Sequence, residues 1–188
     1  MIKEEILQSP DFNIRYTTAE DEPYLREWLN ATGMSHWFAV QEPEEIEELV
    51  KIWISFSRFK CSITATYHQI PCGIATLFLM PYIKVSHMSM GYIIVDPALQ
   101  KQGIGSSLIK NLSHLAHSYF RLERMHYEIY GDNPLADLLK RQGYQLVLTQ
   151  IKPETNFVNT SIIDVESQFP GVPFIVTAVL RKNQLIQA

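Results

Sequence analysis

The chain has 188 residues, of which 46% are hydrophobic and 19% are charged, and its formal net charge is −4. This length and composition predict a single ordered domain over residues 1–188. The sequence has no run of basic residues, and its longest apolar stretch, 73–80, is too short to cross a bilayer, so we expect neither a nucleic acid nor a membrane as a partner.

The first residues and the cysteines indicate the compartment in which the protein works. Residues 1–9 carry charges that a secretory signal peptide would not contain at these positions. The two cysteines, Cys61 and Cys72, match no zinc pattern. We interpret them as buried or half-buried thiols in a reducing compartment, with a disulfide as the less favoured alternative. We therefore expect a cytoplasmic protein without a metal ion.

Hydrophobic periodicity and turn residues predict the element order β-α-α-β-β-β-α-β-α-β-β. The predicted strands are 12–18, 61–67, 70–80, 87–95, 125–130, 144–151 and 174–180. The predicted helices begin after Thr18, at Pro43, at Ile104 and at Asn133, and we expect 152–170 to be a long, poorly defined connection. This order alone predicts an α/β or α+β fold.

The most informative segment is the loop between the strand 87–95 and the helix that begins at Ile104. Asp96-Pro97 ends the strand, because proline cannot donate to a sheet ladder. Gly103 and Gly105 stand where the helix begins, and there the backbone N–H groups lack intrahelical acceptors and favour negative charge. Glycine also lets a bulky anion approach the backbone. The sequence therefore predicts a phosphate-binding loop.

Two common phosphate-binding motifs are excluded. A Walker A loop and a dinucleotide fingerprint each require residues that this loop lacks. The motif present is Gln100-x-x-Gly103-x-Gly105, and a second block, 133–144, begins at an Asn and ends in Gly-Tyr. The two blocks, in this order and at this separation, resemble the GNAT family of N-acetyltransferases, in which the first block holds the pyrophosphate of acetyl-CoA.

The resemblance implies a fold and a binding site. The fold is a mixed, mostly antiparallel sheet with helices on both faces, in which the parallel strands 87–95 and 125–130 splay apart and hold the pantetheine arm of acetyl-CoA between them. Asn133 is expected both to cap its helix and to contact that arm. The implied cofactor-binding residues are Ile93, Ile94, Val95, Gln100, Lys101, Gln102, Gly103, Ile104, Gly105, Ser106 and Asn133.

Acetyl transfer needs a neutral amine, but an amine of pKa near 10.4 is neutral in only about one molecule in a few thousand at pH 7. A base, or a desolvated pocket, is therefore expected to remove a proton from the amine. Glu128 lies five residues before Asn133, which is the offset of the catalytic glutamate in ribosomal-protein N-terminal acetyltransferases of the family. Histone-type members place a glutamate where this sequence has Ser89, and His87 is the second candidate for the base. The alternative for Glu128 is an ion-paired or merely polar strand residue, and the alternative for His87 is a solvated or hydrogen-bonded histidine.

The expected general acid is missing. Many members of the family carry a tyrosine in the last helix, about four residues before the Gly-Phe/Tyr pair, and this sequence has Leu139 there. Tyr130, Tyr144 or water could substitute for it, or no acid is needed. We therefore expect measurable but modest turnover.

Two functions are compatible with these residues. The leading hypothesis is an enzyme that moves an acetyl group from acetyl-CoA to a primary amine by direct transfer in a ternary complex. The alternative is a catalytically weak or inactive acyl-CoA-binding module of the same fold. The acceptor is expected to be a small-molecule or peptide amine. Its identity, the preferred acyl group and the oligomeric state, for which a homodimer is one option, are left open by the sequence.

Overall fold

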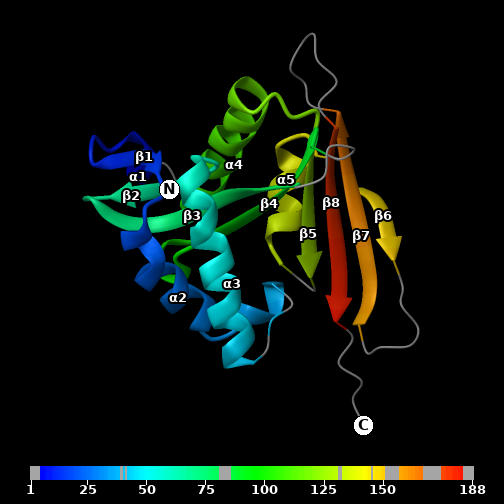
Figure 1. Ribbon diagram of the computed structural model, residues 1–188, viewed down its shortest axis with the longest axis horizontal. Helices are drawn as coiled ribbons and strands as arrows, with labels where there is room; N and C mark the ends of the chain where they lie inside the picture. The colour runs from blue at the N-terminus through cyan, green and yellow to red at the C-terminus, as the bar shows by residue number, and fades with distance from the viewer. Residues whose placement is uncertain are drawn as a thin grey trace. The chain divides into compact units, whose positions relative to one another are not determined.

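The computed structural model describes residues 5–38, 40, 42–80, 86–130, 133–144, 146–150, 157–166 and 175–183 (Figure 1). Its α-helices are α1 (Glu5–Gln8), α2 (Glu22–Asn30), α3 (Pro43–Ser55), α4 (Ile104–His114) and α5 (Leu135–Arg141). Its strands are β1 (Phe12–Tyr16), β2 (Ser62–Tyr67), β3 (Ile70–Leu79), β4 (Met88–Val95), β5 (Arg124–Tyr130), β6 (Leu146–Gln150), β7 (Phe157–Glu166) and β8 (Ile175–Asn183). No helix among the described residues has the length and apolar character needed to cross a membrane.

The chain forms two compact units. Unit 1 consists of Met1–Ser35, Val40–Phe78 and Tyr92–Phe120, and unit 2 consists of His36–Ala39, Leu79–Gly91 and Arg121–Ala188. Strand β4 contributes its first half to unit 2 and its second half to unit 1. The assignment of 1–188 to a single domain stays a prediction.

The sheet of unit 1 has the strand order β1-β2-β3-β4. Strands β1 and β2 are antiparallel, and so are β2 and β3, with a bulge where Ala65 and Thr66 face β3. The N–H of Asp96, just after β4, donates to the carbonyl of Cys72, near the start of β3, at 3.0 Å. The end of β4 therefore lies beside the start of β3, so these two strands are also antiparallel.

Helices cover both faces of β3. A Cβ atom at Gly73 would lie 2.9 Å from Leu108 of α4, so α4 packs on the face to which Gly73 points. Thr76 is three residues further along and points to the opposite face. There its hydroxyl accepts a hydrogen bond from the Trp53 indole of α3, at 2.5 Å. The predicted placement of helices on both faces of the sheet is thus confirmed within unit 1.

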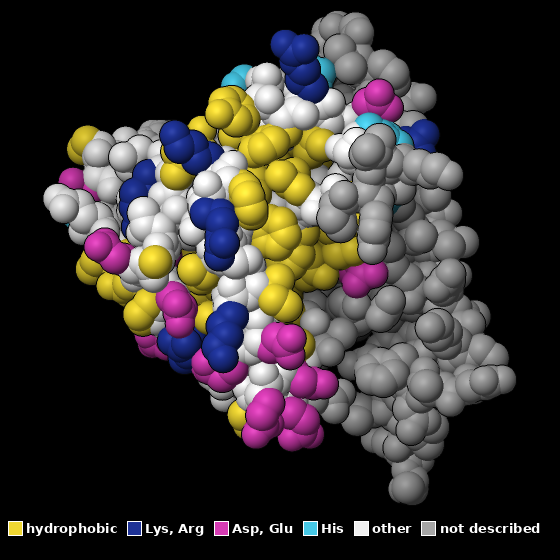
Figure 2. Space-filling view, viewed as in Figure 1, with side chains coloured by type: hydrophobic (Ala, Val, Ile, Leu, Met, Phe, Trp, Pro, Cys, Tyr) yellow, Lys and Arg dark blue, Asp and Glu magenta, His cyan; other side chains and the backbone are white. Residues whose placement is uncertain are grey.

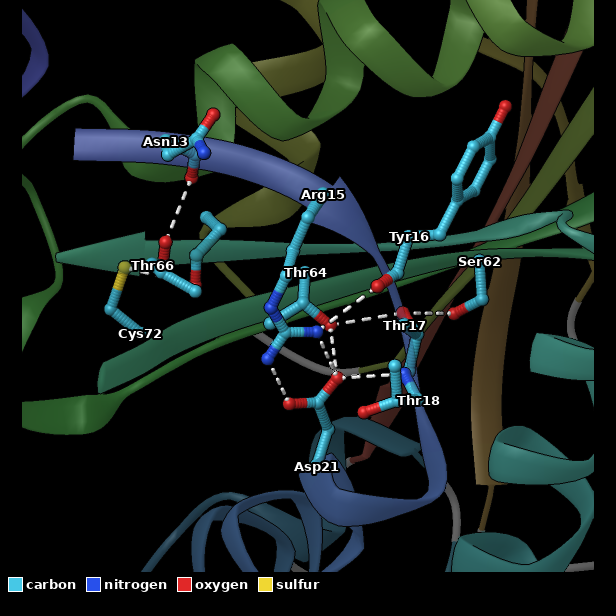
Figure 3. A network of polar contacts seen from close by, with 11 residues as sticks. Asn13, Arg15, Tyr16, Thr17, Thr18, Asp21, Ser62, Thr64, Thr66 and Cys72 are labelled. Carbon is cyan, nitrogen blue, oxygen red and sulfur yellow. Dashed lines mark hydrogen bonds and ion pairs between the residues drawn. The ribbon is translucent and has the colours of Figure 1, made fainter. Parts of the chain in front are cut away.

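A polar network joins β1 and β2 to the turn before α2 (Figure 3). Asp21, only 1% exposed, accepts two hydrogen bonds from the Arg15 guanidinium, at 2.6 and 2.8 Å. It also accepts from the Thr18 backbone N–H and from the Thr64 hydroxyl, each at 2.9 Å. Burial alone would raise the pKa of Asp21, but these hydrogen bonds outweigh it and hold the pKa below its ordinary value. The network therefore fixes the start of α2 on the sheet.

The sheet of unit 2 has the strand order β4-β5-β8-β7-β6. Strand β5 is parallel to both β4 and β8, whereas β7 is antiparallel to β8 and to β6. Strand β7 corrects the expectation that 152–170 contains no regular element. Its β-branched residues suit a strand, and the ladder that stabilises it comes from β8, the next strand along the chain.

The pairing between β4 and β5 is short. Three register pairs join Met88–Met90 to Arg124–His126, and no further pair joins the described residues of these strands. Gly91 and Tyr127 are the first residues beyond the last pair, and the Tyr127 ring occupies the space beside Gly91. This is where the predicted splay between the two parallel strands begins.

Candidate functional site

The loop after β4 leads into α4 through Gly103, the segment that the sequence predicts to bind phosphate. Gly103 has φ 89°, a left-handed conformation that glycine adopts without strain, and it immediately precedes α4. Its carbonyl accepts the N–H of Ser107 at 3.0 Å, which is the first bond of the helical ladder. The backbone N–H groups of Ile104, Gly105 and Ser106 therefore have no acceptor within the helix. Together with the helix dipole they favour a phosphate group.

Packing holds this helix start in place. The Ile104 side chain is 1% exposed and packs against the Gly73 position of β3. Ile93 and Ile94 are also buried, at 7% and 2% exposed. These three residues can therefore offer only backbone groups to a ligand. Gly105 and Ser106, by contrast, are half-buried.

The remaining loop residues have different surroundings. Gln100 places its amide nitrogen 3.6 Å from the Met34 sulfur, which ties the loop to the turn after α2. Lys101 is exposed and has φ 64°, unusual for a residue with a side chain. Gln102 and Val95 are half-buried. Of these residues, Lys101 carries the positive charge that a phosphate would attract.

Asn133 caps α5 in unit 2, as its residue type predicts. Its side-chain carbonyl accepts the backbone N–H of Leu135 at 2.9 Å, and its backbone carbonyl accepts the N–H of Ala136 at 3.2 Å. The residue is 8% exposed. A contact of Asn133 with the cofactor stays a prediction.

Glu128 is a half-buried residue of β5. Met125, Tyr127 and Ile129 alternate along β5 and are fully buried, and the Tyr127 ring packs edge-on against Tyr144, just after α5, with centroids 5.8 Å apart. Glu128 points to the opposite face and is half-buried.

His87 lies in the turn immediately before β4 rather than in the strand itself. Its backbone carbonyl accepts the N–H groups of Glu123 and Arg124, at 2.8 and 3.2 Å. Ser89, the position of the glutamate in histone-type members, is fully buried. The position of Ser89 is therefore inaccessible, and the two base candidates Glu128 and His87 occupy structurally different places in unit 2.

His126 is a further candidate site residue, and the sequence did not predict it. It alternates with Glu128 and so lies on the same face of β5, and its Nε2 atom is buried without a hydrogen-bond partner among the described residues. Burial lowers the pKa of His126 to about 4, with further contributions from Arg124 and His87. The imidazole is therefore neutral at pH 7. His126 stands two residues before Glu128, and in a predicted strand this spacing places both side chains on the same face. The sequence could therefore have indicated His126.

Leu139 is fully buried in unit 2. It precedes the end of α5, where Gly143 has φ 91° and donates to the Lys140 carbonyl at 3.0 Å. The N–H of Tyr144 donates to the Leu139 carbonyl at 3.1 Å, which completes a Schellman cap. Leu139 is therefore a core residue of the helix end.

An aromatic stack lines unit 1 beside α3. Phe78 of β3 is stacked between Phe56 and Tyr92, with ring centroids 4.6 and 4.5 Å apart, and Trp53 packs edge-on against Tyr92 at 5.7 Å. Phe56, Phe78 and Tyr92 keep part of their surface exposed. Figure 2 shows hydrophobic side chains exposed beside α3 on this face. These rings offer an apolar surface within unit 1.

The chain is similar to proteins of one family. The family model described as the acetyltransferase (GNAT) family matches residues 23–144, more than half of the chain. A search among curated proteins found no match.

Solved structures share the fold at low sequence identity. An N-acetyltransferase from Staphylococcus aureus is 17% identical, with a TM-score of 0.64 over 79% of this chain and 93% of its own. A proposed acetyltransferase from Salmonella typhimurium, with its cofactor acetyl-CoA, is 14% identical, with a TM-score of 0.67 over 87% and 98%. A spermidine N-acetyltransferase from Vibrio cholerae, in complex with CoA and spermine, is 15% identical, with a TM-score of 0.62 over 91% and 94%.

Proposed function

Because the chain belongs to the GNAT family of acetyltransferases, we propose that it transfers an acetyl group from acetyl-CoA to a primary amine by direct transfer in a ternary complex. The observation that carries this proposal is the start of α4. Gly103 in the left-handed conformation and the three backbone N–H groups after it suit a pyrophosphate. The anion-binding geometry and the family membership thus support the same cofactor.

The residues of the loop fit the cofactor. The backbone N–H groups of Ile104, Gly105 and Ser106 would hold its pyrophosphate, and the exposed Lys101 would add a positive charge beside it. The second half of β4 would offer backbone groups to the pantetheine arm, in the manner of an added strand. The cofactor supplies an acetyl group activated as a thioester, and the remaining chemistry belongs to the protein.

We assign the base to Glu128. The amine must lose a proton as it attacks, and Glu128 is a half-buried carboxylate on the face of β5 opposite Tyr127. His126 is a neutral neighbour on that face and could hydrogen-bond to the acceptor. His87 is the second candidate for the base.

The cysteines support direct transfer over an acyl-enzyme route. Burial raises the pKa of Cys61 to about 11 and that of Cys72 to about 12, so both remain thiols at neutral pH. Both are fully buried in unit 1, and the Cys61 thiol donates to the Phe56 carbonyl at 3.2 Å. Neither is a nucleophile for an acetyl group.

The acceptor is proposed to be a small-molecule or peptide amine. A structural neighbour from Vibrio cholerae acts on spermidine, and another from Brucella melitensis is a ribosomal-protein-alanine N-acetyltransferase. Both kinds of amine are therefore worth testing. A cytoplasmic location, the absence of a nucleic-acid or membrane partner, and a homodimeric assembly are further proposals.

A thiol-release assay tests the proposal. Native protein is incubated with acetyl-CoA and a panel of polyamines, amino-sugar antibiotics, lysine derivatives and peptides with free N-termini. Release of CoA that depends on one of these amines supports the enzyme. Calorimetric binding of CoA without turnover on any amine favours the second function, an inactive acyl-CoA-binding module, for which the buried leucine at position 139 is the specific observation.

A further inference from the structure

A continuous string of buried polar side chains runs through unit 1, from the turn before α2 to helix α3. Six side chains, each at most 4% exposed, follow one another by hydrogen bonds of 2.5–3.0 Å. In order along the string they are Asp21, Thr64, Thr17, Ser62, Thr76 and Trp53. Figure 3 shows the part from Asp21 to Ser62. The string ends where the Trp53 indole N–H donates to the Thr76 hydroxyl.

The string fixes the orientation of the Trp53 ring. Valine suits a buried strand position as well as threonine does, so filling the core does not by itself call for a hydroxyl at position 76. A fully paired polar network, however, restricts its members to one arrangement. The indole cannot turn without giving up its hydrogen bond to Thr76, and a lost hydrogen bond is costly in a buried place.

The fixed indole contacts the half of β4 that belongs to unit 1. Trp53 packs edge-on against Tyr92 with ring centroids 5.7 Å apart, and Phe78 of β3 stacks on Tyr92 at 4.5 Å. Tyr92 immediately precedes Ile93, the first of the residues whose backbone we expect to meet the pantetheine arm. A ring-to-ring contact thus joins the polar string to the cofactor-binding part of β4.

This part of β4 lacks a strand neighbour on one side. The register pairs with β5 end at Met90, and none joins the described residues beyond it, whereas β3 is the neighbour on the other side. An arm that adds to the open edge like a strand binds best when the edge is already held in place. We propose that Trp53, held by Thr76, is a positioning residue that fixes Tyr92 and with it the edge of β4 that receives the pantetheine arm. This inference rests on the proposed function.

The test compares the two parts of the cofactor. Native protein, Thr76→Val and Thr76→Ser are titrated calorimetrically with CoA and with phosphoadenosine diphosphate, the nucleotide part of CoA, which keeps the pyrophosphate and lacks the pantetheine arm. Valine has nearly the shape of threonine but offers the indole no acceptor. Thr76→Val should bind CoA about fivefold more weakly, which corresponds to about one hydrogen bond. It should bind the nucleotide as native protein does, and Thr76→Ser should restore the affinity for CoA.

Thr66→Val is the matched control. Thr66 is also a buried threonine of the sheet, at 5% exposed, but it donates to the Asn13 carbonyl at 3.4 Å and lies outside the string. Its replacement should leave both affinities unchanged. The Trp53 indole N–H resonance, assigned with Trp53→Phe, should shift in Thr76→Val and stay in place in Thr66→Val.

Tyr92→Leu keeps the test decisive if Thr76→Val does not fold. It removes the ring on which Trp53 acts, so it should weaken the binding of CoA and spare that of the nucleotide. Native affinity for CoA in the folded variants, or an equal loss for CoA and the nucleotide, overturns the positioning role. Amine-dependent release of CoA by native protein then leaves the proposed function intact, whereas failure of native protein to bind CoA overturns both.

Discussion

Gly73 of β3 lies directly under Leu108 of α4. A Cβ atom at Gly73 would stand 2.9 Å from the Leu108 Cδ1 atom and 3.1 Å from the carbonyl oxygen of Ile94. The absence of a side chain at this position lets α4 approach the sheet closely. The same helix carries at its start the N–H groups that we propose to bind the pyrophosphate, so this contact positions the candidate site within unit 1.

Gly73→Ala should therefore destabilise the protein. The added methyl group meets a side chain and a backbone oxygen, and overpacking of this kind costs about 1–3 kcal/mol. The free energy of unfolding, measured by denaturant titration, should fall by that amount. The double variant Gly73→Ala, Leu108→Ala is the control, because it relieves the clash with Leu108. If Gly73→Ala lowers the free energy of unfolding as much in the Leu108→Ala background as in native protein, the two residues are not in the close contact described here.

Asp21 should make stability sensitive to acid. Its pKa is lowered in the folded state, so its contribution is fully present above the unfolded pKa, about 3.9, and is lost as pH falls through the lower folded value. Asp21→Asn should lower the free energy of unfolding by about 3 kcal/mol at pH 7. It removes the charge of a buried carboxylate that is paired with the half-exposed Arg15. The difference in stability between native protein and Asp21→Asn should become smaller below pH 4.

The matched control for Asp21 is Asp137→Asn. Asp137 is 83% exposed and lies 3.8 Å from Lys140, so its replacement should hardly change stability at any pH. Melting temperatures of the three proteins between pH 3 and pH 7 give the comparison. A constant gap between native protein and Asp21→Asn over this range would show that the ionised carboxylate is not the source of the stability.

Leu139→Tyr should destabilise the protein and bring no gain in turnover. The sequence alone left open whether a tyrosine here would restore the family's acid, but Leu139 is fully buried, so the larger side chain overpacks the core of unit 2. The melting temperature and the rate of thiol release are measured on the same sample. Faster turnover at an unchanged melting temperature would mean that this helix face opens toward the cofactor.

Glu128→Gln should lower turnover by about two to four powers of ten, the usual contribution of a general base. The affinity for CoA should hardly change, and the acidic limb of the pH–rate profile should flatten. His87→Gln is the comparison, since it removes the other candidate. If His87→Gln produces the loss and Glu128→Gln does not, the assignment of the two residues must be exchanged.

The features that the sequence predicted best are those formed by residues close together in the chain. The strand before Asp96, the start of a helix at the glycines of the loop and the apolar stripe of α4 all follow from residues close together in the chain. The cap at Asn133 follows in the same way. These features make up most of the candidate cofactor site, and the binding of the cofactor by that site stays a prediction.

Features that depend on distant partners were missed. The fit of Tyr127 against Gly91 joins two strands that are far apart in sequence, and neither residue is unusual alone. The low pKa of His126 likewise arises from burial and from neighbours that only the fold brings together.

The most direct test of the account is calorimetric binding of CoA to native protein, to Gly105→Glu and to Lys110→Glu. Both variants add a carboxylate to α4, but Gly105 lies in its first turn and Lys110 on its exposed side. Native protein and Lys110→Glu should bind CoA alike, whereas folded Gly105→Glu should not bind it, because a side chain and a negative charge occupy the anion site. Unchanged affinity in folded Gly105→Glu would contradict the claim that the start of α4 holds the cofactor.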